Sequence, residues 1–222
     1  MMQTNMAPEP TILIANEFLD ALPVYQFEYV GGKWRDRDVG LGGGGDQLAF
    51  EADMTSSVTP PFLPEDAAPQ EGDVFETSTQ YGVLAGELFR TRAELAPFAA
   101  LLIDYGHMKT ALGDTLQGVA GQAHVSPFHA PGETDLSVQV DFERFAAECR
   151  SAGLDTDGPL PQGEFLGRLG IMERASRLMA ANPDKALAIE TGVARLMAPS
   201  GMGSRFKAIG LSTGLAPLPG FA

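Results

Sequence analysis

Two short apolar runs along the chain predict neighbouring strands of one sheet. Thr11–Ala15 and Ala100–Asp104 are mostly aliphatic, which is typical of strands that are buried on both faces. Between them, Tyr81–Ala96 has apolar residues near helical spacing, and Pro97 ends the predicted helix. A strand, a crossover helix and a second strand form a βαβ unit. We therefore expect two parallel strands, with Thr11–Ala15 as a central strand.

The segment between these runs predicts an antiparallel insertion. Apolar and polar residues alternate over several short stretches, and Gly31-Gly32 provides a tight turn between the first two. Residues 54–72 contain four prolines among small and acidic residues, so we expect a long surface loop there. The predicted strands are Val24–Val30, Lys33–Val39, Gln47–Asp53 and Val74–Thr77.

The last third of the chain reads as mainly helical. Asp141–Ala152 is amphipathic, and Gln162–Ala181 with a helix from Pro183 to near Arg195 predicts a helical hairpin. Phe206–Leu211 predicts a last strand. We expect one apolar stripe of the hairpin to lie in the core, namely Phe165, Leu169, Met172 and Met179.

Composition and charge narrow the class of protein. The 222 residues suffice for a sizeable core. The net charge is −14, and all of it belongs to residues 1–140, with 20 acidic and 6 basic side chains. This charge argues against nucleic acid or an anionic membrane as partner and favours a basic one. No run is long enough to span a membrane, no secretion signal is present, and Cys149 is the only cysteine, so we expect a cytoplasmic protein.

Several motifs suggest chemistry that their context rejects. Residues 40–45 match the letters GxGxxG, but a strand-like segment follows them instead of a helix, so we expect a hairpin loop. His107, His124 and His129 have no spacing known for metal ligands, and we expect no metal site. Cys149 lies within a predicted helix and is expected to be a buried structural thiol.

Polar side chains follow both predicted parallel strands at their carboxyl ends, where ligands bind in open α/β sheets. Asn16, Glu17 and Asp20 follow the first strand, and Asp104–His107 end the second. An amide and two carboxylates can accept hydrogen bonds from a guanidinium or an ammonium group. The alternative is a helix cap, in which Asn16 or Asp20 binds backbone N–H groups.

These residues also carry a family resemblance. The segment NEFLDALPVYQF (residues 16–27) resembles the hallmark of the MidA family of S-adenosylmethionine-dependent methyltransferases. Three further blocks agree in order, and the resemblance covers nearly the whole chain from residue 11. The blocks are LLIDYGHMKTALGDTLQGV, PGETDLSVQVDF, and QGEFLGRLGIMERA followed by GMGSRFKAIGL.

The resemblance implies an α/β fold with a class I methyltransferase (Rossmann-like) sheet. In the family, the glycine-rich cofactor loop precedes the hallmark, and only fifteen residues do so here. We therefore expect an incomplete sheet and an incomplete S-adenosylmethionine site. Residues 1–140 would form a partial core with an acidic hairpin and loop insertion. Residues 141–222 would add the helical hairpin and last strand to the same domain.

The resemblance also implies a function and a set of site residues. Methylation of a protein side chain such as arginine is expected, with Glu17 and Asp20 orienting the guanidinium and helping to withdraw its proton. Residues expected to face substrate or cofactor are Asn16, Phe18, Asp104, Tyr105, Gly106 and His107. Two alternatives remain: a non-catalytic remnant that binds a basic protein, for instance in respiratory complex I assembly, and an acidic α/β domain of another function.

Overall fold

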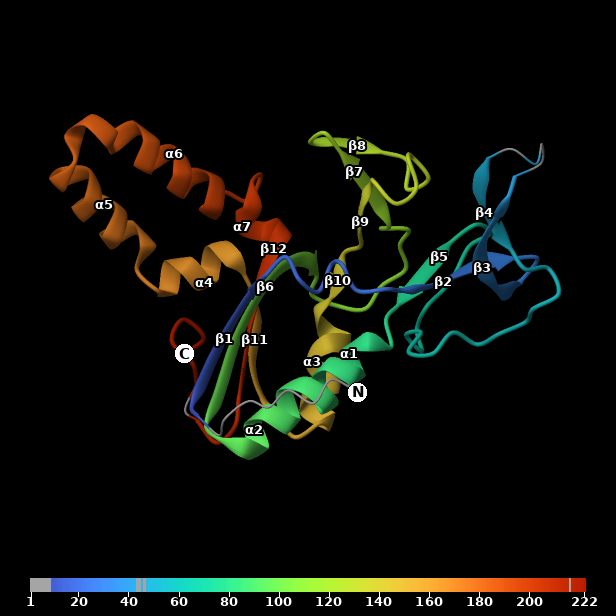
Figure 1. Cartoon of the computed structure of the whole chain (residues 1–222), viewed down its shortest axis with the longest axis horizontal. Coiled ribbons are helices and arrows are strands. Elements are labelled where there is room, and N and C mark those ends of the chain that lie inside the picture. The colour runs from blue at the N-terminus through green and yellow to red at the C-terminus, as the bar shows by residue number, and fades with distance from the viewer. Residues whose placement is uncertain (1–8, 43–44, 46, 216) are drawn as a thin grey trace.

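The computed structural model describes residues 9–42, 45, 47–215 and 217–222. Its main sheet is mixed, with the strand order β1 (Thr11–Asn16), β6 (Phe98–His107), β12 (Phe206–Ser212) and β11 (Asp155–Pro161) (Figure 1). β1 is parallel to β6, whereas β12 is antiparallel to both β6 and β11. The short β10 (Val140–Asp141) pairs with the carboxyl end of β6.

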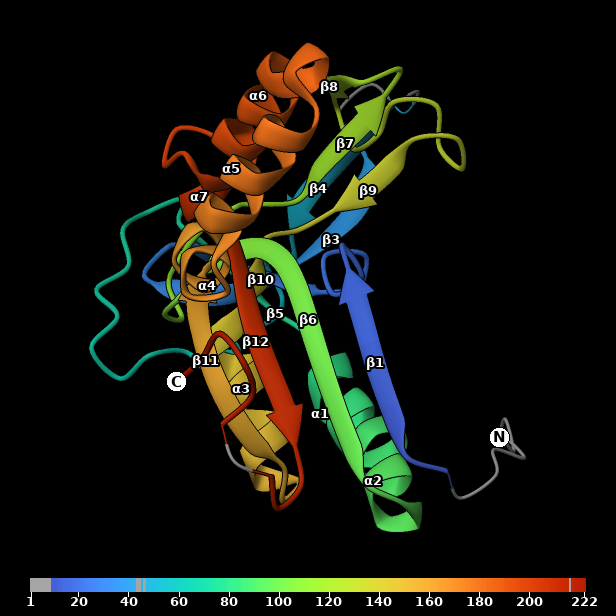
Figure 2. The ribbon, with the colours of Figure 1, turned by 90° about the vertical axis from the view of Figure 1, so that its left-hand side faces the viewer.

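The predicted βαβ unit is confirmed, but the predicted central position of its first strand is wrong for the described residues. β1 pairs with β6 from Thr11↔Phe98 to Asn16↔Ile103, and no described strand pairs with its other edge (Figure 2). Ile12 and Ile14 are 82% and 71% exposed on the face opposite the helices. The aliphatic run predicts a strand whose two faces are suited to burial, but it does not predict which segments pack against each face.

Helices cover the other face of the main sheet. The predicted helix over Tyr81–Ala96 is present as α1 (Gln80–Val83), a π-helical segment (Leu84–Arg90) and α2 (Thr91–Leu95). α3 (Phe142–Ser151) packs beside it, and the side chain of its N-cap residue Asp141 accepts a hydrogen bond from the backbone N–H of Arg144. Figure 2 shows these helices behind the four strands.

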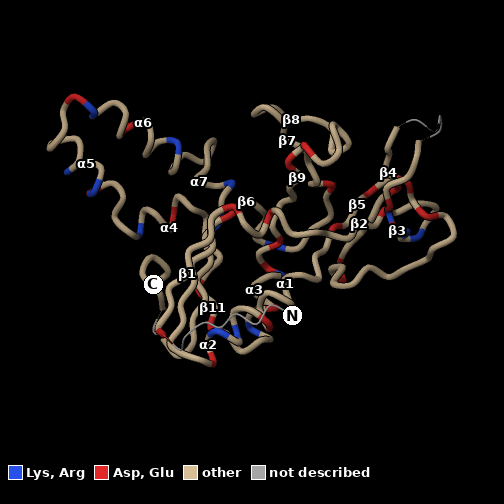
Figure 3. Tube along the Cα trace, in the orientation of Figure 1, with Lys and Arg blue, Asp and Glu red and all other residues tan. Residues whose placement is uncertain are grey.

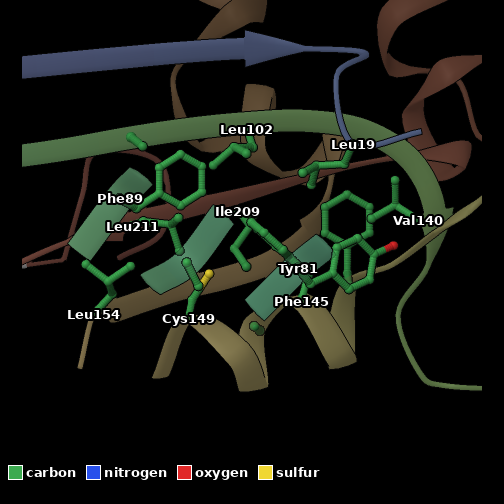
Figure 4. Close-up of a cluster of buried hydrophobic side chains, with 14 of the residues drawn as sticks. Leu19, Tyr81, Phe89, Leu102, Val140, Phe145, Cys149, Leu154, Ile209 and Leu211 are labelled. Carbon is green, nitrogen blue, oxygen red and sulfur yellow. The ribbon is translucent and has the colours of Figure 1, made fainter. Parts of the chain in front are cut away.

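The core lies between the sheet and these helices (Figure 4). Phe89 stacks on Phe98 of β6 with ring centroids 6.0 Å apart, and it meets Phe145 of α3 edge-on at 6.5 Å. Cys149 is fully buried in this cluster, and burial raises the pKa of its thiol to about 12. The prediction of a buried structural thiol is confirmed.

The predicted insertion forms a second, antiparallel sheet in the order β4-β3-β2-β5. The turn at Gly31-Gly32 has φ values of 62° and 74°, which a glycine adopts without strain. Residues 54–72 contain no helix or named strand, as predicted. Of the GxGxxG letters, Gly40 belongs to β3, while positions 43 and 44 lie outside the described residues. The strands are β2 (Tyr25–Val30), β3 (Lys33–Leu41), β4 (Leu48–Ala52) and β5 (Val74–Thr77).

A third, three-stranded sheet and strand β11 were not predicted. The third sheet has the order β8-β7-β9, with β7 (Gln117–Ala120), β8 (Ala123–Val125) and β9 (Asp135–Ser137). Strands of three or four residues are too short to show alternation. β11 has the sequence DTDGPLP, whose glycine and prolines favour a loop, and it forms only because β12 lies beside it.

The C-terminal helices form the predicted hairpin but depart from the prediction in two ways. The expected helix over Gln162–Ala181 is broken at Gly170, where φ is 78°. Leu169 and Met172 are exposed, so their placement in the core was wrong, because α5 and α6 extend away from the main sheet (Figure 1). The helices are α4 (Gln162–Arg168), α5 (Ile171–Ala181), a 3-10 turn (Pro183–Lys185), α6 (Ala186–Met197) and α7 (Met202–Arg205).

Candidate functional site

The loop after β1 is held by one buried carboxylate. Oδ2 of Asp104 accepts hydrogen bonds from the backbone N–H groups of Phe18, Leu19 and Asp20 at 3.0, 2.9 and 3.2 Å. Oδ1 accepts a fourth from the backbone N–H of Tyr105 at 2.9 Å. Asp104 is 1% exposed, and burial raises the pKa of its carboxyl to about 6, with a further contribution from the Asp20 carboxylate. Asp104 therefore holds the loop after β1 in place through hydrogen bonds to the loop's backbone.

Glu17 stands at the start of this loop in a strained conformation. Its φ of 50° is in the left-handed region, which non-glycine residues seldom adopt. Its backbone N–H donates to the carbonyl of Ile103 at 2.9 Å, so the pairing with β6 fixes the backbone there. Nδ2 of Asn16 donates to Oε1 of Glu17 at 3.1 Å. Both side chains are exposed, and such strain is often retained at functional positions.

Asp20 and Tyr105 form a second polar pair beside Glu17. The hydroxyl of Tyr105 donates to Oδ2 of Asp20 at 2.5 Å, and Asp20 is buried. Burial, and next the hydrogen bond to Asp20, raise the pKa of Tyr105 above its ordinary value. Tyr105 therefore stays protonated and its hydroxyl donates to Asp20. The other carboxylate oxygen of Asp20 accepts no hydrogen bond from a described side chain.

These groups line a cleft of about 510 Å³ at the carboxyl ends of β1 and β6. The third sheet forms one wall of the cleft, and the ends of α6 and α7 form the other. Charged side chains of both signs line it. The residues are Glu17, Asp20, Tyr105, Gln117, Val119, Asp135, Ser137, Arg195, Gly201, Met202, Arg205 and Phe206.

The structure separates the sequence-predicted residues into groups. Glu17, Asp20 and Tyr105 share the cleft, Asn16 adjoins it through its bond to Glu17, and Asp104 lies beneath the loop. Phe18 is 43% exposed and lines none of the described pockets.

Gly106 and His107 lie further along β6, in different surroundings. A Cβ atom on Gly106 would lie 2.1 Å from the carbonyl oxygen of Val140, so this glycine allows β10 to pair with β6. His107 lines a smaller cavity of about 170 Å³ with Glu76, Tyr81 and Arg144. Its Nδ1–H donates to the carbonyl of Lys109 at 2.6 Å. His107 does not line the cleft, so its contact with substrate or cofactor stays a prediction.

Sequence reasoning missed both walls of the cleft. Asp135 and Ser137 lie within the block PGETDLSVQVDF, and Arg205 lies within GMGSRFKAIGL. Both blocks carried the family resemblance but were not assigned to the site. The sequence did contain a signal for these residues, because the family resemblance extends to both blocks, far from the hallmark segment.

In the part of the chain that the structure describes, no three His, Cys, Asp or Glu side chains gather in a way that could hold a metal ion. None of the described helices is long and apolar enough to cross a membrane.

Comparisons with known proteins identify relatives of the chain. A family model described as "Putative S-adenosyl-L-methionine-dependent methyltransferase" matches residues 1–160. The chain is 33% identical over 215 residues to the Drosophila melanogaster "Protein arginine methyltransferase NDUFAF7 homolog, mitochondrial", covering 92% of this chain and 48% of the relative. It is 33% identical to the human "Protein arginine methyltransferase NDUFAF7, mitochondrial", covering 87% and 43%. The chain thus spans about half the length of these relatives.

Two solved structures are also similar to this chain. A "likely methyl transferase" from Burkholderia thailandensis, bound to S-adenosyl-homocysteine, superposes with a TM-score of 0.79 and 26% identity. The match covers 98% of this chain and 58% of that one. Another Burkholderia thailandensis structure, of an uncharacterized protein, gives a TM-score of 0.80 at 25% identity.

Proposed function

Because the chain belongs to a family of S-adenosyl-L-methionine-dependent methyltransferases, we propose that it forms the substrate-binding part of an enzyme that methylates a protein arginine. The observation that carries this proposal is the cleft at the carboxyl ends of β1 and β6, where Glu17, Asp20 and Tyr105 converge. The named relatives are protein arginine methyltransferases, which supports arginine as the target.

The two carboxylates have different parts in this proposal. Glu17 is exposed, and Asn16 occupies only one of its oxygens, so its carboxylate can accept hydrogen bonds from a guanidinium and take up the proton that the group loses on methylation. Asp20 is fixed by Tyr105 and offers one remaining oxygen to the same guanidinium. Asp104 holds the loop that carries both residues, so we assign it a positioning role. Positioning of the nucleophile is expected to supply much of the rate.

The described residues do not fit a complete S-adenosylmethionine site. The loop after β1 presents carboxylates. The glycine that adjoins the cleft at a helix start, Gly201, caps the four-residue helix α7 and follows α6, so it does not belong to a strand-to-helix turn of the kind that holds a nucleotide cofactor. The uncovered edge of β1, with Ile12 and Ile14 exposed beside it, can accept further strands of a class I methyltransferase sheet. We propose that the cofactor binds against residues packed along that edge.

A binding experiment tests the assignment of substrate and cofactor sides. The 222-residue chain is titrated with an arginine-containing peptide and, separately, with S-adenosylmethionine by calorimetry. We expect arginine-dependent peptide binding and no micromolar binding of the cofactor. Micromolar binding of S-adenosylmethionine would show that this chain does form a cofactor site and would contradict the proposal.

The Glu17→Gln variant tests the role of the first carboxylate. It should weaken peptide binding by about fivefold, because one charged hydrogen-bond acceptor becomes neutral. Glu173→Gln removes the same charge from the exposed surface of α5 and serves as the control. Equal affinities of both variants for the peptide would remove Glu17 from the proposed site.

A non-catalytic role is the second candidate, and the exposed carboxylates that line the cleft are the observation that favours it. The cleft could then hold a basic protein segment without modifying it. Methylation of an arginine peptide, measured with radiolabelled S-adenosylmethionine after the cofactor-binding part of a relative is supplied, distinguishes the two. Product that forms only with the wild-type chain and not with Glu17→Gln supports the enzyme.

A further inference from the structure

The cleft carries charges of both signs that do not neutralise each other. Glu17 and Asp135 supply exposed carboxylates, and Arg195 and Arg205 supply exposed guanidinium groups. Neither arginine forms an ion pair within 4.0 Å with any described residue. Figure 3 shows acidic positions close to β9 and close to the end of β6, and basic positions on α6 and at α7.

The two guanidinium groups come from separate helices of the same wall. Arg195 lies in the last turn of α6 and Arg205 at the end of α7, and the two helices contact each other. Two guanidinium groups that line one cleft can together bind a single carboxylate, with paired N–H donors from each. The carboxylates Glu17, Asp20 and Asp135 contribute the opposite charge to the same cleft.

We propose that the substrate segment carries an acidic residue close to its target arginine. This inference rests on the proposed function: the arginine meets Glu17 and Asp20, and the neighbouring carboxylate meets Arg195 and Arg205. A cleft of about 510 Å³ is equivalent to a cube with edges of about 8 Å. An extended chain rises about 3.3 Å per residue, so the acidic residue lies within about two or three positions of the arginine.

The net charge of the chain makes the proposal easy to distinguish from general attraction. At −14, the chain attracts a more basic peptide more strongly and repels an added carboxylate. If only this field acted, an acidic residue beside the arginine would weaken binding. Local pairing with Arg195 and Arg205 predicts the opposite order.

Three fluorescent peptides of eleven residues in a Gly/Ser background test the order. The first has a central arginine with glutamate two positions away on either side, the second has glutamine at those two positions, and the third keeps the glutamates but replaces the arginine with glutamine. Anisotropy titrations with the 222-residue chain at 0.15 M salt give the affinities. We expect the first peptide to bind about fivefold more tightly than the second.

The double variant Arg195→Gln/Arg205→Gln should remove this preference. Arg174→Gln/Arg177→Gln removes two exposed positive charges from α5, outside the cleft, and should keep it. Both variants change the net charge equally, so a difference between them reports the local pairing. Because all four arginines are exposed, we expect far-UV circular dichroism to show that both variants are folded.

Other results of the peptide titrations would overturn the acidic-neighbour inference, the proposed function, or both. Equal or reversed affinities of the first two peptides overturn the acidic-neighbour inference, and the proposed function stands if both bind more tightly than the third. Equal binding of the first and third peptides overturns the arginine substrate. A glutamate preference that persists in the cleft variant places the carboxylate elsewhere and overturns the role of Arg195 and Arg205. Absence of binding by all three up to about 1 mM overturns both proposals.

Discussion

Replacing Asp104 with asparagine should remove a distinct pH dependence from the stability of the protein. The pKa of the buried Asp104 carboxyl is raised from 3.8 to about 6. Between these two pKa values, the folded protein holds a proton that the unfolded chain has released. The free energy of unfolding therefore falls as the pH rises from about 4 to about 6, and the contribution of Asp104 to stability is greatest below pH 4.

The magnitude follows from the size of the pKa shift. A rise of about 2.2 units, at 1.36 kcal/mol per unit, corresponds to about 3 kcal/mol in total. Integrating the titration of a single group with these two pKa values places about 1.3 kcal/mol of this loss between pH 5 and pH 7. Asparagine does not titrate, so the variant lacks this loss, whatever its stability at a fixed pH.

Urea unfolding followed by far-UV circular dichroism at pH 5 and pH 7 measures the effect. The change in unfolding free energy between the two pH values is compared for the wild type and Asp104→Asn, which cancels the other titrating groups. We expect the wild type to lose about 1 kcal/mol more than the variant on going to pH 7. Asp66→Asn, in the exposed loop, is the matched control and should follow the wild type.

Two results would refute this reasoning. An equal change in the wild type and in Asp104→Asn would mean that the four backbone N–H donors offset the cost of burial. A wild type that gains stability relative to the variant as the pH rises would mean that these donors lower the pKa of Asp104 below its ordinary value. In either case the loop after β1 would be held by a carboxylate that is ionised at every pH of interest.

Three further substitutions test the surroundings of the cleft. Gly106→Ala should lower the unfolding free energy by about 3 kcal/mol, because its Cβ would meet the backbone of β10, whereas Gly86→Ala has open space and should not destabilise in the same urea titration. Tyr105→Phe should lower the free energy of unfolding by about 2 kcal/mol, because the buried Asp20 carboxylate loses its hydrogen-bond donor; an unchanged urea midpoint would contradict this. Glu17→Gly should raise the free energy of unfolding by about 1 kcal/mol in thermal unfolding, because glycine adopts the left-handed backbone without strain, and it should weaken arginine-peptide binding. A lower free energy of unfolding would show that Glu17 is not strained.

The elements that follow from local pattern were predictable. The parallel pair β1 and β6, the Gly31-Gly32 hairpin and the helix over Tyr81–Ala96 each follow from periodicity, turn residues or a terminating proline. The break at Gly170 was not predicted, because a single glycine within a helical pattern is often tolerated and only the backbone conformation shows that it ends the helix.

The cleft was predictable only on the side that the strand ends provide. Glu17, Asp20 and Tyr105 follow strands whose carboxyl ends meet, so topology alone brings them together. Asp104 occupies the same kind of position, yet it points into the protein, and an aspartate at a strand end does not show in the sequence which way it faces. The sequence pattern does not place Arg195 and Arg205 at the cleft, because only the packing of α6 and α7 brings them there.

The edge of β1 with which no described strand pairs also has consequences for the handling of this chain in solution. The strand Thr-Ile-Leu-Ile-Ala-Asn has no charged side chain or proline, which are the residues that keep exposed strand edges from pairing with another molecule. The net charge of −14 keeps separate copies apart through repulsion, which is screened beyond about 10 Å at 0.1 M salt. Low ionic strength should therefore keep the chain dispersed, and added salt should promote association through this edge before any loss of the fold.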